Sequence, residues 1–272
     1  RAYSGLADPN QPRHVFAFFG GSGVGKTASA LALAEYLFDS PSALIRLDMS
    51  EYKEPHSVSR LLGSPPGYIG YEDEGTFATR LRRQLFSVVL LDEVEKAHPQ
   101  ILDTFLHIFD SGSFSDSRAR QVDARHAVFI LTSNLYTVPE LASAEEYEQH
   151  AASIRLSLEG FFRPELVNRI SSIVLFRQLG LPDLQEIARR EIETLNERMQ
   201  QHGLRLQPGK GVLEWLAEQA MGDPGGVRAL QHLVNRELAE PAASLLLGST
   251  APADVLYIEI EDNRLVLRGG EG

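Results

Sequence analysis

Residues 20–27 read Gly20-Gly21-Ser22-Gly23-Val24-Gly25-Lys26-Thr27, which is a glycine, four further residues and then Gly-Lys-Thr. An apolar run at 15–19 precedes this stretch, and a run of helix-forming residues at 28–37 follows it. The order strand, glycine-rich loop and helix is the context in which this pattern is a phosphate-binding P-loop rather than a plain turn. Glycines let backbone N–H groups approach the phosphates, and the helix start adds the positive end of its dipole. The stretch therefore predicts a bound nucleoside triphosphate.

Two side chains of the loop and an acidic pair further along predict the chemistry at this phosphate. Lys26 is expected to reach the β- and γ-phosphates, and the Thr27 hydroxyl to hold Mg²⁺. The apolar run 88–91 ends in Asp92 and Glu93. Asp92 supplies the hard oxygen ligand that Mg²⁺ prefers, and Glu93 is expected to deprotonate the water that attacks the γ-phosphate. The alternative is an exposed acidic pair at a helix start, which the preceding P-loop makes the weaker interpretation.

The composition is that of an ordinary globular protein. Of the 272 residues, 43% are hydrophobic and 23% are charged, and the chain is long enough for two domains. The net charge of −11 argues against a general electrostatic attraction to nucleic acid. Cysteine is absent, which excludes disulfides, and no apolar run approaches the roughly 20 residues needed to cross a bilayer. We therefore expect a cytoplasmic protein without nucleic-acid or membrane partners. Because the chain starts with neither methionine nor a signal peptide, we also expect a piece of a longer protein.

The apolar pattern predicts an α/β fold followed by a second, smaller domain. Helix-period segments alternate with short apolar runs, as in a parallel sheet covered on both faces, at 15–19, 44–47, 88–91, 127–131 and, more weakly, 173–176. After residue 178 the pattern indicates amphipathic helices at 183–200, 211–219 and 227–247, and two strands within 255–267 around Asp262-Asn263. We predict a large domain over 1–178 with about five parallel strands, and a mostly helical domain over 179–272.

Several further motifs resemble the second ATPase module of the Clp/Hsp100 AAA+ unfoldases, most closely the ClpB-type disaggregases. Besides the P-loop and the acidic pair, the matching segments are 48–52, 63–71, 96–99 and 162–170, and the resemblance extends from about residue 6 to residue 247. It implies a P-loop AAA+ ATPase domain with a helical lid, and ATP and Mg²⁺ as cofactors. It also implies a homo-oligomer, a hexamer in the full-length protein, that acts on unfolded or aggregated polypeptide.

The resemblance assigns roles to four more residues. Asn134 matches the sensor 1 residue, which hydrogen-bonds the γ-phosphate and the attacking water; capping of the next helix is the alternative. Arg169 matches the arginine finger that acts on the neighbouring subunit's nucleotide, although an ordinary ion pair is the alternative. Arg228 matches the sensor 2 arginine of the lid, in a motif that departs from the usual Gly-Ala-Arg-Pro-Leu. Tyr68 matches the pore-loop aromatic that grips an extended polypeptide through its flat apolar face.

Four functions remain open from the sequence. The leading one is a module that hydrolyses ATP to thread polypeptide through a hexameric pore. Within the same class, the alternatives are an unfoldase subunit of a Clp protease and a type VI sheath disassembler. Residues 134–161 contain no Ile-Gly-Phe or Ile-Gly-Leu tripeptide, which argues against the protease partner. From another class, the alternative is a module that binds nucleotide without hydrolysing it.

Overall fold

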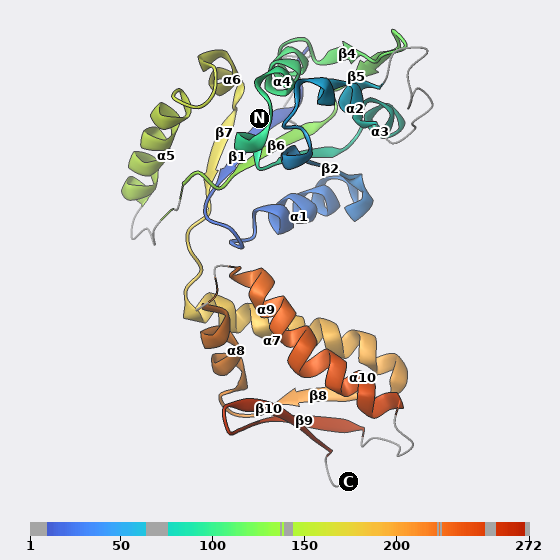
Figure 1. Ribbon diagram of the computed structural model, residues 1–272, viewed down its shortest axis with the longest axis vertical. Helices are drawn as coiled ribbons and strands as arrows, with labels where there is room; N and C mark the ends of the chain where they lie inside the picture. The colour runs from blue at the N-terminus through green and yellow to red at the C-terminus, as the bar shows by residue number, and fades with distance from the viewer. Residues whose placement is uncertain are drawn as a thin grey trace. The chain divides into compact units, whose positions relative to one another are not determined.

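The computed structural model describes residues 10–63, 76–136, 138, 144–221, 223, 225–247 and 254–269. The chain forms two compact units (Figure 1). The first comprises residues 1–21 and 25–178, and the second comprises residues 22–24 and 179–272. Each unit has a hydrophobic core of its own.

The first unit is built around a five-stranded parallel sheet in the order β2-β3-β6-β1-β7. These strands are β1 (His14–Phe19), β2 (Leu44–Asp48), β3 (Val88–Asp92), β6 (Val128–Ser133) and β7 (Ser172–Leu175). Strands β3 and β6 are buried along their whole length, as their apolar sequences require of a sheet that is covered on both faces. The predicted α/β fold with about five parallel strands is thereby confirmed.

Helices cover both faces of this sheet (Figure 1). Helix α1 (Lys26–Phe38) packs on one face. The other face carries helices α2 (Val58–Leu62), α3 (Phe77–Arg83) and α4 (Pro99–Ser111), and the core on that side is completed by α5 (Ala144–Leu158) and α6 (Pro164–Arg169). Short 3-10 turns connect these elements at η1 (Pro41–Ala43), η2 (Met49–Glu51), η3 (Pro55–Ser57) and η4 (Val94–Lys96).

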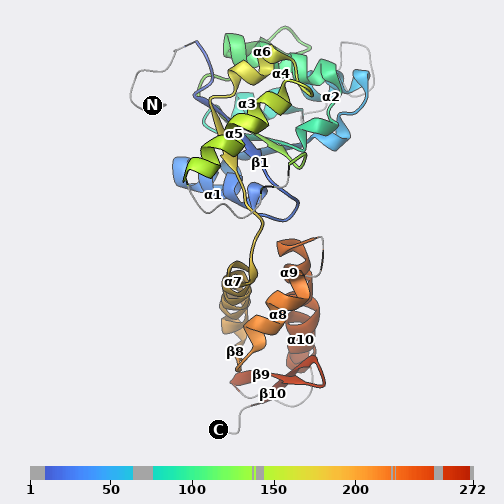
Figure 2. The same ribbon diagram turned by 90° about the vertical axis from the view of Figure 1, so that its left-hand side faces the viewer.

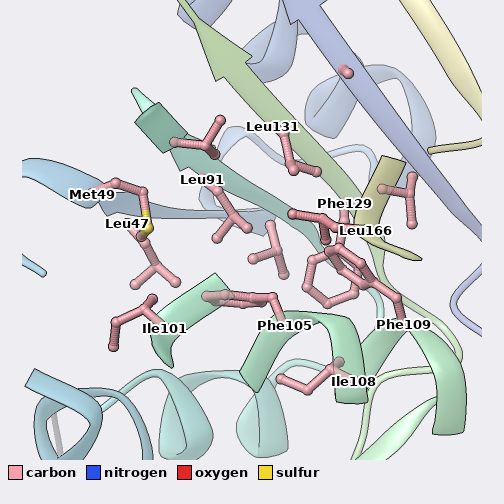
Figure 3. Close-up of a cluster of buried hydrophobic side chains, with 14 of the residues drawn as sticks. Leu47, Met49, Leu91, Ile101, Phe105, Ile108, Phe109, Phe129, Leu131 and Leu166 are labelled. Carbon is pink, nitrogen blue, oxygen red and sulfur yellow. The ribbon is translucent and has the colours of Figure 1, made fainter. Parts of the chain in front are cut away.

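The core on the α4 face is rich in aromatic rings (Figure 3). Phe105 and Phe109 of α4 lie edge-on to Phe129 of β6, with ring centroids 6.4 and 5.0 Å apart. Side chains alternate between the two faces of a strand, so Leu91 packs toward α4 and Leu90 toward α1. The same alternation turns the residues that follow Leu91 and Leu131 toward the face that carries α1.

An antiparallel hairpin, β4 (Ser113–Ser115) with β5 (Gln121–Asp123), follows α4. Its turn is organised by Asp116, whose carboxylate accepts the backbone N–H groups of Arg118 and Arg120 and the guanidinium of Arg120. Burial alone would raise the pKa of Asp116, but these donors outweigh it and the pKa is lowered. Strands β4 and β5 were not predicted, because three residues are too few to show an alternating pattern in the sequence.

The second unit packs helices on a three-stranded sheet (Figure 2). Its elements are α7 (Leu181–Met199), η5 (Gln200–His202), β8 (Arg205–Pro208), α8 (Val212–Met221), α9 (Val227–Val234), η6 (Asn235–Ala239), α10 (Glu240–Leu247), β9 (Val255–Glu261) and β10 (Arg264–Gly269). The π-helical segment η6 joins α9 to α10, so the predicted helix over 227–247 is one continuous helix.

The predicted strand pair at the end of the chain is confirmed, because β9 and β10 are antiparallel. Asp262 and Asn263 have φ values of 47° and 60°, which is the left-handed conformation that a type I′ hairpin turn requires. Strand β8, which pairs in parallel with β9, was not predicted, because four residues carry too little pattern.

Candidate nucleotide-binding site

The candidate site lies at the carboxyl edge of the five-stranded sheet. Strand β1 leads into the P-loop, β3 ends in Asp92, and Asn134 follows the end of β6. These three strands are neighbours in the sheet, in the order β3-β6-β1. The carboxyl ends of parallel strands are where open α/β sheets bind their ligands.

Lys26 is buried at this edge, although its side chain carries a charge. Its ammonium group donates hydrogen bonds to the carbonyl oxygens of Gly20 at 2.7 Å and Gly21 at 2.6 Å, and to Asn134 Oδ1 at 2.8 Å. Only 7% of the residue is exposed. A buried charge requires such partners, and an ammonium group at this edge is also suited to bind an anion such as phosphate.

Two glycines of the loop have structural reasons to be glycine. A Cβ atom on Gly20 would lie 2.4 Å from the carbonyl oxygen of Phe176. The backbone N–H of Phe176 donates to the carbonyl oxygen of Phe19, which fixes Phe176 at this position. Gly25 precedes α1 and has φ 98° and ψ 11°, a left-handed backbone conformation that residues other than glycine rarely adopt. The chain path into α1 therefore depends on both positions.

The carboxylate of Asp92 is held from two sides. The Thr132 hydroxyl donates to Asp92 Oδ1 at 2.6 Å, and the guanidinium of Arg46 donates to Asp92 Oδ2 at 2.6 Å. The Asp92 side chain is 8% exposed. Thr132 Oγ1 also accepts the backbone N–H of Glu93 at 3.0 Å. One threonine of β6 thus orients both acidic residues at the end of β3.

Glu93 has a strained backbone and a fully engaged carboxylate. Its φ of 59° and ψ of 57° lie in the left-handed region, which costs a residue with a side chain about 1 kcal/mol or more. Glu93 Oε1 accepts from Asn134 Nδ2 at 2.8 Å, and Oε2 accepts from Lys96 Nζ at 2.5 Å. The bond to Glu93 raises the pKa of Lys96. Strain of this kind concentrates at functional sites.

Asn134 joins the P-loop to the acidic pair. Its side chain accepts from Lys26 and donates to Glu93, and its backbone N–H donates to Glu95 Oε1 at 3.1 Å. The structure therefore brings Lys26, Asn134 and Glu93 into one hydrogen-bonded chain across three strands. The sensor 1 role itself remains a prediction.

The remaining predicted residues lie outside this network. Arg169 ends α6 and pairs with Asp110 of α4, while Arg163 pairs with Asp103 at 3.0 Å. Arg169 thus has an intramolecular ion pair, which is the alternative that its sequence context left open. Arg228 lies in the first turn of α9 in the second unit. The pore-loop prediction at Tyr68 lies outside the residues that the structure describes.

The donor set suits a magnesium ion that is shared with phosphates. Thr27 in the first turn of α1 supplies a hydroxyl, and Asp92 supplies a carboxylate. Across the described ranges, no group of three or more His, Cys, Asp or Glu side chains forms a metal cage. Mg²⁺ commonly binds through one or two protein oxygens together with phosphates and water, so these two side chains fit that ion.

Four residues of this network were not predicted as site residues from the sequence: Arg46, Thr132, Glu95 and Lys96. A signal was present for two of them. Arg46 interrupts the apolar strand β2, and Thr132 is a polar residue that is completely buried in β6. A polar side chain inside an apolar strand requires a buried partner, which is a reason to look for one.

The parallel sheet, the glycine loop before α1 and the acidic pair at the end of the adjacent β3 define a P-loop nucleotide-binding domain of the α/β class. The model of the family described as AAA domain (Cdc48 subfamily) matches residues 11–173. A second model, the C-terminal, D2-small domain, of ClpB protein, matches residues 179–256. The chain therefore belongs to the AAA domain family, and a ClpB-type D2-small domain follows the AAA domain in the sequence.

Curated relatives match along almost the whole chain. Chaperone protein ClpB 1 of Synechococcus elongatus is 40% identical over 272 residues, which cover 98% of this chain and 31% of the relative. Chaperone protein ClpB 1 of Parasynechococcus marenigrum is 41% identical over 269 residues, 97% of this chain and 31% of the relative. Chaperone protein ClpB of Enterococcus faecalis is 40% identical over 274 residues, with coverages of 98% and 31%.

These matches confirm the predicted resemblance to the ClpB-type branch of the Clp/Hsp100 AAA+ proteins. The chain spans about a third of the length of the curated relatives that it matches. Within the part of the chain that the structure describes, no helix combines the length and apolarity needed to cross a membrane.

Proposed function

We propose that this chain is an ATP-dependent disaggregase module, which hydrolyses ATP to thread unfolded or aggregated polypeptide through the pore of a homo-hexamer. The observation that carries the proposal is the hydrogen-bonded chain from Lys26 through Asn134 to Glu93, beside Asp92. The relatives are named as chaperones, which favours this function over a Clp protease subunit or a type VI sheath disassembler. We further propose a cytoplasmic location, without nucleic-acid or membrane partners.

In the proposed site the loop amides of residues 20–27 and Lys26 bind the phosphates of ATP, and Thr27 and Asp92 hold Mg²⁺. The ion, when bound, neutralises charge that develops on the phosphates. Lys26 exchanges its three present acceptors, the carbonyl oxygens of Gly20 and Gly21 and Asn134 Oδ1, for phosphate oxygens. Asn134 Oδ1 is then released to orient the attacking water. Glu93 then accepts the proton of that water.

Three further residues complete the proposal through the family resemblance. Arg169 acts on the nucleotide of the neighbouring subunit, for which it must leave Asp110. Arg228 acts on the nucleotide from the lid. In this proposal the lid comprises residues 179–272 and the large domain comprises residues 1–178. Tyr68 grips the threaded polypeptide.

The variant Glu93→Gln tests hydrolysis directly. It should bind Mg²⁺ and ATP as the parent does, while phosphate release falls by about 10²–10⁴-fold because the general base is lost. Glu193→Gln removes an exposed carboxylate of α7 that pairs with Arg189, and it serves as the control with parental turnover. Unchanged turnover in Glu93→Gln, or a parent that binds ATP without turnover, would favour the non-hydrolysing module.

The proposed action of Arg169 across a subunit boundary is tested by mixing variants. Arg169→Ala and Glu93→Gln should each hydrolyse ATP poorly alone. A mixture should regain turnover, because an intact arginine of one subunit then faces an intact Glu93 of the next. Molar mass measured with ATP shows whether mixed rings form, and mixed rings without regained turnover would contradict the assignment.

The pore-loop assignment is tested in the full-length protein by the unfolding of a stably folded, tagged substrate. Tyr68→Ala should lose threading while it retains ATP turnover, and Tyr68→Phe, which keeps the flat ring, should retain both. Unfolding at the parental rate by Tyr68→Ala would contradict the threading mechanism.

A further inference from the structure

The carboxylate that is proposed to hold Mg²⁺ already has a cation of this chain beside it. The Arg46 guanidinium lies 2.6 Å from Asp92 Oδ2, and the Thr132 hydroxyl donates to Asp92 Oδ1 at 2.6 Å. The Asp92 side chain is 8% exposed and that of Arg46 is 48% exposed. Both oxygens of Asp92 are therefore engaged, one by a neutral group and one by a positive charge.

The register of β2 explains why an arginine reaches this position. Ile45 and Leu47 are buried in the core on the α4 face, so Arg46 between them is turned to the face that carries α1. Arg46 pairs in register with Leu90, and Asp92 follows two residues later on the same face of β3. The ion pair is thus a diagonal contact between neighbouring strands.

The guanidinium has space to leave Asp92. The Arg46 side chain is 48% exposed, and Arg46 is one of the residues that line a polar cavity of about 500 Å³, together with Asp48, Glu51, Arg60 and Arg80 among others. Asp48 lies two residues along β2 and so on the same face of the strand as Arg46, and it is a carboxylate to which the guanidinium can turn. Arg80 donates to the backbone carbonyl of Arg46 at 3.3 Å, which holds the strand while the side chain moves.

A divalent cation and the guanidinium compete for one carboxylate. If Arg46 remains beside Asp92, it repels Mg²⁺ through like charge at short range, and if it leaves, the ion pair is lost. Both routes weaken Mg²⁺ binding. Asp92 keeps its orientation without Arg46, because Thr132 still holds Oδ1.

We propose that Arg46 is a tethered cation that competes with Mg²⁺ for Asp92 and so sets the Mg²⁺ affinity of the nucleotide-bound site. The proposal rests on the proposed function, in which Asp92 holds the ion. It assigns Arg46 a regulating role that is opposite to that of a residue which positions Asp92 for the metal.

The test is the Mg²⁺ affinity of the ADP-bound 272-residue chain, measured by calorimetric titration at constant ionic strength. Arg46→Gln and Arg46→Met should bind Mg²⁺ on the order of tenfold more tightly than the parent, which is the effect expected for loss of one charge-assisted hydrogen bond. Arg46→Lys keeps a cation and should stay near the parent. Arg60→Gln removes an arginine from the same cavity, where it faces Glu51 at 3.6 Å, and should leave the affinity within about twofold.

Unchanged or weaker Mg²⁺ binding in both neutral Arg46 variants would overturn the competition. Equal tightening in Arg60→Gln would also overturn it, because general charge would then explain the effect. The variant Asp92→Asn distinguishes a failure of this inference alone from a failure of the proposed function. If Asp92→Asn binds Mg²⁺ as the parent does, Asp92 does not hold the ion, and the assignment in the proposed function fails together with the inference.

Discussion

The middle of the five-stranded sheet and its carboxyl edge belong to the same strands but are held by different forces. In the middle, side chains such as Leu90 and Phe129 are completely buried and contact other apolar groups, without any directional requirement. At the edge, Asp92, Thr132 and Asn134 are each held by specific hydrogen bonds. Adjacent residues of one strand can therefore be selected for different properties. The apolar residue must fill the core, and the polar residue that follows it must form specific hydrogen bonds.

The two regions also differ in what they do to the stability of the fold. Burial of apolar surface in the middle stabilises the unit. The edge contains the buried charge of Lys26 and the left-handed backbone of Glu93, both of which cost free energy. The apolar middle offsets these costs, and it does so without taking part in the chemistry. Substitutions in the two regions should then have separable effects.

The largest loss of stability is expected from Phe129→Ala in the middle of the sheet. Phe129 is fully buried against Phe105 and Phe109, so its removal should lower the free energy of unfolding by about 3–5 kcal/mol. Urea denaturation measures this change. At a temperature where the variant stays folded, its nucleotide affinity should stay within about twofold of the parent. A large loss of affinity in the folded variant would show that the two regions are coupled.

Thr132→Val at the edge should lose less stability but more activity. Valine has a similar shape, but it cannot donate to Asp92 or accept from Glu93, so we expect a loss of about 2–4 kcal/mol. Turnover should fall at least about tenfold, because both acidic residues lose their orientation. Thr79→Val is the matched control: Thr79 is a buried threonine of α3, bonded to Thr76, and its variant should keep parental turnover.

Gly20→Ala tests the backbone at the edge. The added Cβ would meet the Phe176 carbonyl oxygen at 2.4 Å, so the backbone must shift, at a cost of about 1–3 kcal/mol. Gly21 has open space around its Cβ position, and Gly21→Ala should be close to parental stability. Thermal unfolding of the two variants measures the difference, and equal melting temperatures would contradict the close approach.

The smallest effect is expected on an exposed surface, where charge-assisted bonds of the same kind contribute little. Hydrogen bonds from Arg189 and then Arg190 lower the pKa of Glu186 in α7 from 4.5 to about 2. A depressed carboxyl pKa stabilises the fold above the unfolded value of 4.5, and this stability is lost as the pH falls toward 2. The parent should therefore be slightly more stable than Glu186→Gln at neutral pH, and the difference should disappear through that window. Denaturant midpoints at several pH values check it, and a difference that is as large at pH 2 as at neutral pH would contradict the assigned pKa.

Local patterns were enough to predict the P-loop, the five strands and the closing hairpin. Glycine spacing, short apolar runs and the Asp262-Asn263 turn act over a few neighbouring residues, and local backbone preference and burial follow from them directly. The short strands β4, β5 and β8 were not predicted, since three or four residues do not establish a period. Thr132 and Arg46 were visible as polar interruptions of apolar strands, but their partners were not.

Those partners come from the packing of distant segments. Lys26 and Asn134 are 108 positions apart, and Arg46 and Asp92 are 46 apart. They meet because the strands adopt the order β2-β3-β6-β1-β7 in one register, and a slip of one residue would turn Asp92 or Thr132 to the opposite face. The residue types for nucleotide chemistry are thus present in the linear chain. Which oxygen contacts which cation depends on strand order and register. Strand order and register arise from burial of the whole sheet, so no local pattern in the sequence predicts these contacts.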